Sequence, residues 1–157
     1  MADNLRRCAG DTRATGARVG HTVAVAPPAP YDAQNFLQLL GIDIPMPHED
    51  RDMVARLTVG HALIAGTGYL WAPVVIAMAD ALCAFGVSRH WPEGARSFTT
   101  LNCSSQFLAS AREGEEVTAT AAPLHLGRST QVWDATVLND STERLMASYR
   151  CTQMILY

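Results

Sequence analysis

The stretch Val74–Phe85, VVIAMADALCAF, decides the fold because it is apolar throughout except for one carboxylate, Asp80. Pro73 precedes it and suits the first turn of a helix, where the missing N–H of proline is no loss. A helix that is apolar on nearly every side must be covered on nearly every side. We therefore predict a buried central helix from Pro73 to about Val87, with one acid on it.

The segments around this helix have the alternation expected of strands. DMVARLTV, residues 52–59, places every second side chain on an apolar face. Four later segments, separated by short polar or glycine-containing turns, are also predicted to be strands: 96–108, 115–124, 128–140 and 143–156. We expect these four to form consecutive hairpins, and so an antiparallel meander that wraps around the helix.

The chain divides into two regions by composition. Residues 1–30 are rich in Ala, Gly, Thr, Arg and Pro and show no sustained period, which predicts a tail. Residues 31–157 are predicted to form a single domain. YDAQNFLQLLG, residues 31–41, predicts a short helix with Asp32 as N-cap and Gly41 as the left-handed closing residue.

Charge and composition exclude several classes of partner. The net charge is −3, from 12 basic and 15 acidic residues with no basic cluster, so we expect no nucleic acid partner. Residues 69–87 are long enough to suggest a membrane span, but they contain Asp80, Pro73 and Gly86 and have almost no basic flanks. We therefore expect no membrane insertion.

Cysteine and histidine usage points to a chain without a metal site. The four cysteines form no Cys-x-x-Cys pair, and the five histidines are scattered, so we predict neither metal nor cofactor. The first apolar residues are interrupted by charges, so they do not resemble a secretory leader. These features predict a cytoplasmic protein with reduced thiols.

Three segments together resemble a known family. LGIDI (40–44), MADALCAF (78–85) and FLASAREGEEVTATAAPLHLGRSTQVWDATVLND (107–140), in this order, resemble the hotdog-fold acyl-CoA thioesterases of the phenylacetate-degradation and 4-hydroxybenzoyl-CoA types. The similarity covers roughly residues 36 to 155. It implies an α+β hotdog fold, an antiparallel sheet wrapped around a long central helix, and the hydrolysis of an acyl-CoA to free acid and coenzyme A. A lone hotdog unit leaves part of its surface uncovered, so we expect a homodimer or a dimer of dimers, with the site at the subunit contact.

The resemblance also assigns roles to individual residues. Asp80, on the central helix, attacks the thioester carbonyl or activates water, and the backbone N–H of Ala72 polarises that carbonyl. A helix start is suited to this because its free N–H groups favour negative charge. The coenzyme A phosphates are expected beside Arg128, Ser129 and Thr130, where one cation and two hydroxyls suit phosphate. Arg112 offers similar chemistry, although an ordinary surface role is the simpler interpretation.

One segment departs from the family pattern. Members usually carry His-Gly-Gly where this chain has Trp71-Ala72-Pro73, and proline supplies no N–H. Trp71 either shapes an acyl pocket or fills it. Two alternatives therefore stay open: a catalytically silent protein that binds acyl-CoA or a lipid-like ligand, and a 3-hydroxyacyl thioester dehydratase, which would pair an acid with His61.

The residues alone leave further roles open. From its spacing, Asp80 is equally a buried partner in a hydrogen bond or ion pair, for instance with an arginine across an interface. Asn102, Ser104 and Ser105 lie on the strand expected near the helix, where they could position water or substrate. An ordinary structural role is the simpler interpretation for these three.

Overall fold

The computed structural model describes residues 34–45 and 53–157. The helices are α1 (Gln34–Leu40), the short 3-10 helix η1 (His61–Leu63) and α2 (Ala72–Arg89). The strands are β1 (Met53–Thr58), β2 (Ser97–Phe107), β3 (Glu116–Leu126), β4 (Thr130–Asn139) and β5 (Arg144–Leu156). The predicted central helix and all five predicted strands are confirmed. The predicted tail, residues 1–30, and the predicted N-cap Asp32 lie outside the described residues.

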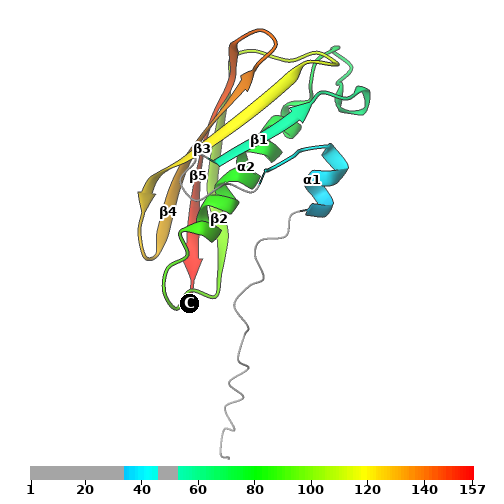
Figure 1. Cartoon of the computed structure of the whole chain (residues 1–157). Helices are drawn as coiled ribbons and strands as arrows, with labels where there is room; N and C mark the ends of the chain where they lie inside the picture. The colour runs from blue at the N-terminus through cyan, green and yellow to red at the C-terminus, as the bar shows by residue number, and fades with distance from the viewer. Residues whose placement is uncertain (1–33, 46–52) are drawn as a thin grey trace, which may run out of the picture.

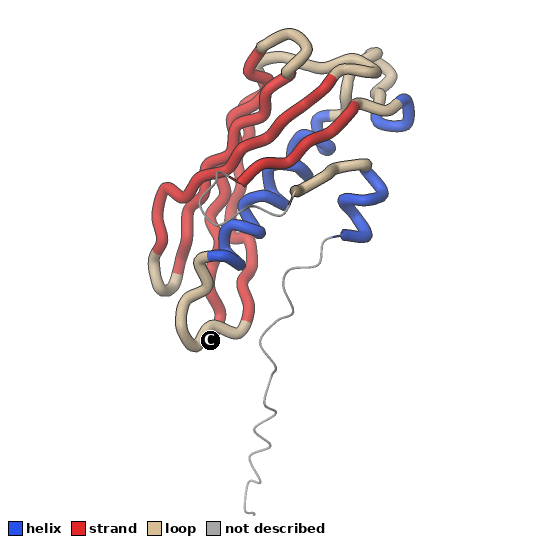
Figure 2. The backbone as a smooth tube through the Cα atoms, in the orientation of Figure 1, coloured by secondary structure: helices blue, strands red, loops and turns tan. Residues whose placement is uncertain are grey.

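The five strands form one antiparallel sheet in the order β1-β3-β4-β5-β2. The sheet makes one layer and α2 lies along one of its faces (Figures 1 and 2). The predicted meander is confirmed for β3, β4 and β5. It is wrong for β2, which pairs with β5 at the opposite edge from β1.

The connection between β2 and β3 explains this difference. After β2, the N–H groups of Leu108 and Ala109 still bond the carbonyl of Met146, at 2.7 and 3.2 Å, beside β5. By Gly114 the chain has reached β1, because its N–H bonds the carbonyl of Val59 at 2.8 Å. Residues 108–115 therefore cross the end of the sheet, although their sequence looks like a hairpin turn.

Helix α2 is the centre of the core. Ten of its residues are buried, among them Met78, Leu82 and Val87, which lose nearly all contact with solvent. By length and composition alone, α2 could cross a membrane, yet more than half of it is buried within this fold. Its apolar surface is covered by the strands, as the sequence predicts for a core helix.

The sheet approaches α2 most closely at Gly86. A Cβ atom at this position would lie 2.5 Å from two ring carbons of Trp133, which projects from β4. Trp133 is buried, and its indole N–H donates to Gln131 Oε1 at 3.1 Å. Gln131 in turn donates to the carbonyl of His90, just after α2, at 2.8 Å. Glycine at position 86 therefore sets the distance between helix and sheet.

Strand β2 has a free edge. Within the described part of the chain it pairs only with β5, and nine of its eleven residues are exposed. Its pairing with β5 shifts register between Thr100 and Asn102, which leaves Leu101 as an exposed bulge residue. A long unpaired edge of this kind is a ready template for a second strand.

We predict that Gly86→Ala destabilises the domain. Alanine normally stabilises the middle of a helix relative to glycine by about 1 kcal/mol. At this position overpacking against Trp133 should reverse the sign and lower the free energy of unfolding by about 1–3 kcal/mol. Urea unfolding of wild type and variant measures the change.

Gly60→Ala is the matched control, since Gly60 has φ −84° and nothing within 4 Å of its added Cβ. It should change the free energy of unfolding by no more than about 0.5 kcal/mol. A Gly86→Ala variant as stable as wild type would contradict the close approach of Trp133.

Candidate active site

Asp80 lies on the face of α2 that meets β5. Its Oδ1 accepts a hydrogen bond from the hydroxyl of Tyr149 at 2.7 Å, and the thiol of Cys151 lies 3.8 Å from the same oxygen. Asp80 is half-buried, whereas Tyr149 and Cys151 are buried. The sequence placed an acid here and considered an arginine partner, but within this chain its described partners are a phenol and a thiol.

Tyr149 was missed at the sequence level, although a signal was present. It alternates with the buried residues Ala147 and Cys151 along β5 and so belongs to the inner face of the sheet. A buried tyrosine hydroxyl almost always has a hydrogen-bond partner. That requirement, together with the presence of one acid on an otherwise apolar helix, is the signal in the sequence for a Tyr149–Asp80 pair.

The phenol beside Asp80 is uncharged. Burial is the larger cause and the hydrogen bond to Asp80 is the second, and together they raise the pKa of Tyr149 far above its usual range, so its hydroxyl stays protonated. The hydrogen bond between the two thiols raises the pKa of Cys83 and lowers the pKa of Cys151. No cationic side chain within the described ranges forms an ion pair with Asp80. Among the described residues, Asp80 therefore has a protonated phenol as its donor and no countercharge.

The two carboxylate oxygens of Asp80 differ in their hydrogen-bond contacts. Both described contacts are made to Oδ1, and none is made to Oδ2. The only buried side-chain oxygen or nitrogen without a partner, among the residues that the structure describes, is Ser105 Oγ. Asp80 Oδ2 also has no partner in the described part of the chain but is not one of these buried atoms, so it keeps access to solvent. It is therefore the oxygen that a substrate could contact.

Ala72 presents an unused backbone donor at the start of α2. The N–H of Leu70 bonds the carbonyl of Ala111 at 2.8 Å, that of Trp71 bonds Leu63 at 3.0 Å, and that of Val74 bonds Trp71 at 3.0 Å. Pro73 has no N–H, and no acceptor for the Ala72 N–H lies in the described part of the chain. A free N–H at the positive end of a helix is suited to an oxyanion. Trp71, the N-cap residue, is 51% exposed.

A single chain does not bring Asp80 and Ala72 together. They are eight positions apart on one helix, which places them about 12 Å apart along its axis. An oxyanion donor must lie about 3 Å from the reacting oxygen, and the attacking group is equally close to the reacting carbon. One carbonyl therefore does not reach both groups of the same chain.

The Arg128–Thr130 turn joins β3 to β4 and is fastened to the end of β5. The carbonyl of Ser129 accepts from the N–H of Ile155 at 2.9 Å, and that of Arg128 accepts from the Tyr157 hydroxyl at 2.6 Å. The Arg128 guanidinium lies 5.2 Å from the Tyr157 ring centroid. The three predicted phosphate-binding residues therefore lie together on a turn whose backbone is fixed by these two hydrogen bonds. The turn lies toward the C-terminal end of α2, where Gln131 bonds His90, and so at the opposite end from Ala72.

His61 does not belong to the Asp80 site. Its Nδ1 lies 2.8 Å from Glu113 Oε2, and its side chain is 88% exposed. The hydrogen bond to Glu113 raises the pKa of His61. Among the described residues, no group of three or more His, Cys, Asp or Glu side chains is arranged to hold a metal ion.

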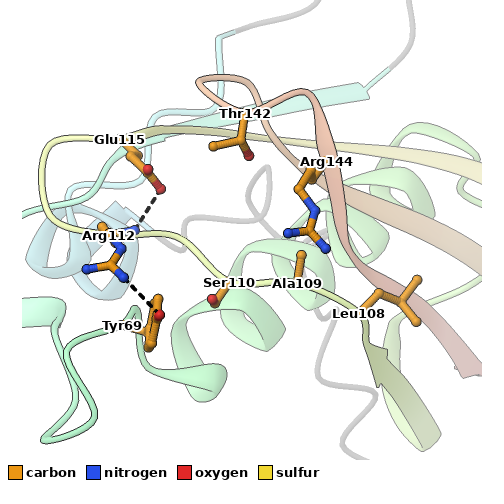
Figure 3. Close-up of a pocket in the computed structure, with 8 residues that line it drawn as sticks. All are labelled: Tyr69, Leu108, Ala109, Ser110, Arg112, Glu115, Thr142 and Arg144. Carbon is orange, nitrogen blue, oxygen red and sulfur yellow. Dashed lines mark hydrogen bonds between the residues drawn. The ribbon is translucent and has the colours of Figure 1, made fainter.

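A pocket of about 400 Å³ lies beside the segment that leads into α2 (Figure 3). The Arg112 guanidinium lies 4.8 Å from the Tyr69 ring centroid and donates to the Tyr69 hydroxyl at 3.0 Å. Glu115 accepts from the Arg112 N–H at 2.8 Å and from Asn139 at 2.7 Å, and these bonds lower the pKa of Glu115. Arg112 is therefore an ordered cation at the surface, in line with the ordinary surface role that was the simpler interpretation of the sequence. The full lining is Tyr69, Leu108, Ala109, Ser110, Arg112, Glu115, Thr142 and Arg144.

Comparison with known proteins identifies the family. Residues 67–146 match the thioesterase superfamily. The chain is 33% identical over 115 residues to the 1,4-dihydroxy-2-naphthoyl-CoA hydrolase of Listeria monocytogenes, covering 73% of this chain and 90% of that protein. It is 28% identical to the crystal structure of thioesterase HI1161 from Haemophilus influenzae, with a TM-score of 0.69 over 79% of this chain and 84% of the other.

A further crystal structure, that of PaaI from the phenylacetic acid degradation operon of Escherichia coli, shares the fold. Its TM-score is 0.69 at 23% identity, over 81% of this chain and 88% of the other. The chain belongs to the thioesterase superfamily. The predicted hotdog fold and the predicted class of thioester hydrolase are therefore confirmed.

Proposed function

We propose that this protein hydrolyses acyl-CoA thioesters to free acid and coenzyme A, as a homodimer in the cytoplasm. The observation that carries the proposal is the Asp80 carboxylate, half-buried on α2, with neutral partners on Oδ1 and an unoccupied Oδ2. The Listeria relative is named as a hydrolase of a CoA thioester, which supports this substrate class. The free thiols of Cys83, Cys103 and Cys151 fit a reducing compartment.

Either of two routes uses the same oxygen. In the first, Oδ2 of Asp80 attacks the thioester carbonyl carbon, the C–S bond breaks, and coenzyme A leaves as a thiolate that takes a proton. Water then hydrolyses the mixed anhydride and restores the carboxylate. In the second, Oδ2 accepts a proton from water as the water attacks the same carbon, and the proton passes to the leaving thiolate. In both routes an N–H such as that of Ala72 stabilises the oxyanion.

We predict that Asp80→Asn lowers turnover of acyl-CoA at least about a hundredfold, because an amide is neither a nucleophile nor a base on the scale of a carboxylate. Coenzyme A release from a panel of aromatic and aliphatic acyl-CoAs measures it. Asp134→Asn is the matched control, because Asp134 is paired on the sheet with Arg150 at 2.6 and 2.7 Å. It should stay within about threefold of wild type.

Two results would contradict the proposal. Turnover that survives Asp80→Asn would remove Asp80 from the chemistry. Tight acyl-CoA binding by a folded wild type without turnover of any substrate would favour the silent binding protein, with Trp71-Ala72-Pro73 as its cause. The dehydratase alternative has no support in the site geometry, because His61 is exposed and bonded to Glu113.

Two features support the proposed homodimer: the spacing of Ala72 and Asp80 on α2 and the free edge of β2. Because Ala72 and Asp80 lie about 12 Å apart along one helix, a second copy must supply one of them if both act on one carbonyl. Antiparallel pairing of two β2 edges would continue the sheet and bring the two copies of α2 alongside each other. Exposed apolar side chains on and just after β2, Leu101, Phe107 and Leu108, would then be covered.

We predict that two inactive variants complement each other. Ala72→Pro removes the N–H but suits a helix start, and Trp71 already has the extended ψ of 128° that a following proline requires. Asp80→Asn and Ala72→Pro homodimers should both be strongly impaired. A heterodimer purified with two different tags should recover about half of wild-type activity, because one of its two sites is intact.

Ala72→Gly, which retains the N–H, is the control for Ala72→Pro. An inactive heterodimer, or a wild type that elutes as a monomer at micromolar concentration, would contradict a site shared between copies.

The coenzyme A phosphates are proposed to bind at Arg128, Ser129 and Thr130, and Trp71 to contact the acyl or pantetheine portion. Ser129 and Arg128 are exposed, and their backbone carbonyls are held by β5 and Tyr157, so the turn is fixed while its side chains remain available. A cation on a fixed turn suits an anionic phosphate.

We predict that Arg128→Ala raises KM for acyl-CoA about tenfold with little change in kcat, which is the scale of one charge-assisted hydrogen bond. Arg112→Ala is the matched control and should leave KM within about twofold. With an acyl thioester of N-acetylcysteamine, which has no phosphates, Arg128→Ala and wild type should have equal KM. If Arg112→Ala raises KM instead, the phosphates occupy the pocket of Figure 3.

A further inference from the structure

We propose that Tyr149 is a positioning residue of the thioesterase site, because its hydroxyl holds Oδ1 of Asp80 and leaves Oδ2 as the oxygen that reacts. The inference rests on the proposed function of Asp80. It adds a residue that the family resemblance did not assign and that lies 69 positions away in the sequence.

The contact between the two side chains is short and partly buried. The Tyr149 hydroxyl lies 2.7 Å from Oδ1, and Tyr149 is only 2% exposed. Because burial and the Asp80 hydrogen bond hold the pKa of Tyr149 far above its usual range, the phenol keeps the proton with which it bonds Asp80. Hydrogen bonds from a neutral donor to a carboxylate are stronger than those between two neutral groups.

This bond fixes the orientation of the carboxylate. The terminal torsion of an aspartate is broad and roughly two-fold, so an unrestrained carboxylate samples many planes. In this site the Cys151 thiol, 3.8 Å from Oδ1, approaches the same oxygen as Tyr149. Both neighbours therefore select one oxygen, and the carboxylate plane is set with Oδ2 toward the open side.

The described side chains around the pair are mainly thiols and a hydroxyl. Cys151 lies on β5, Cys83 lies one turn from Asp80 on α2, and Cys103 lies opposite Cys151 in the β2–β5 register. Ser105 lies opposite Tyr149 in the β2–β5 register. Asp134 on β4 is paired with Arg150 on β5. Among the described residues, Tyr149 therefore makes the shortest contact with the Asp80 carboxylate, at 2.7 Å.

A purely structural bond is the competing explanation. In that case Asp80 would serve to satisfy a buried tyrosine, and loss of the bond would lower stability without changing the chemistry. The two explanations differ in the pH dependence of catalysis and in the behaviour of a double variant. Both readouts concern how Tyr149 acts through Asp80 and not the stability of the fold.

The test begins with Tyr149→Phe in the full-length dimer, assayed for coenzyme A release. Phenylalanine keeps the ring and removes only the donor. We expect kcat to fall about tenfold or more, as for one hydrogen bond to a charged group, with KM changed less than about twofold. We also expect the acid limb of the kcat/KM profile to move to higher pH, because the carboxylate has lost a donor that stabilises its charged form.

The double variant tests whether Tyr149 acts through Asp80. Tyr149→Phe combined with Asp80→Asn should be no slower than Asp80→Asn alone, since the positioned carboxylate is already absent. Tyr69→Phe is the matched control, because it removes a partnered phenol hydroxyl outside this site, and it should leave both rate and pH profile unchanged. If Tyr149→Phe does not fold, 3-fluorotyrosine at position 149 keeps the ring and strengthens the donor, and should move the acid limb to lower pH.

The outcomes separate this inference from the proposed function. An Asp80→Asn variant as active as wild type overturns the role of Asp80 itself. An inactive Asp80→Asn together with a Tyr149→Phe variant whose kcat and pH profile match wild type overturns only the positioning role. A double variant markedly slower than Asp80→Asn also overturns it, because Tyr149 would then act independently of the carboxylate.

Discussion

The structure depends on covering α2. This helix is apolar on nearly all sides, so it is stable only where a sheet wraps it, and β1, β3, β4 and β5 all contact it. The covering is tight enough that a Cβ atom at Gly86 would lie 2.5 Å from the Trp133 ring. The same burial makes any polar group on α2 conspicuous, because a carboxylate on such a helix needs a partner or a path to solvent. Asp80 has a partner on one oxygen and a path to solvent on the other.

The sequence predicts the features that depend on neighbouring residues, and it does not predict those that depend on segments far apart in the chain. Residues 73–87 and the alternating strands carry local patterns, so helix, strands and fold class were predicted correctly. The position of β2 was not, because its pairing with β5 depends on residues 108–115 crossing the sheet end, and that segment has the composition of a hairpin turn. Leu145 shares the alternation of the buried residues Ala147 and Tyr149 along β5, yet it is exposed, because the β4–β5 register shifts beside Leu138.

The residues of the candidate site also fall into two groups: those that stand out in the local sequence and those that only the fold brings together. Asp80 stands out in the sequence because it interrupts an apolar run, and Ala72 follows from the helix start and from the family resemblance. Tyr149 does not stand out, because a tyrosine in an alternating strand is common, and only the folded structure brings it to Asp80. The resemblance supplied the roles of Arg128, Ser129 and Thr130, and the structure adds the hydrogen bonds that fix their turn.

The rigid geometry of a helix connects fold, assembly and chemistry. On one α2, the backbone N–H of residue 72, proposed as the oxyanion donor, and the carboxylate of residue 80 are held about 12 Å apart, and no side-chain rotation closes that distance to the length of one carbonyl group. The fold also leaves β2 unpaired along a sheet edge. A second copy on that edge would address both features, since it would pair the strand and bring a second α2 alongside the first. In such an assembly Trp71-Ala72-Pro73 would face the substrate from one copy while Asp80, oriented by Tyr149, would face it from the other. The missing glycine N–H at Pro73 would then leave the Ala72 N–H as the sole backbone donor of that segment, so the rate would depend heavily on one hydrogen bond and on how firmly the opposing carboxylate is held.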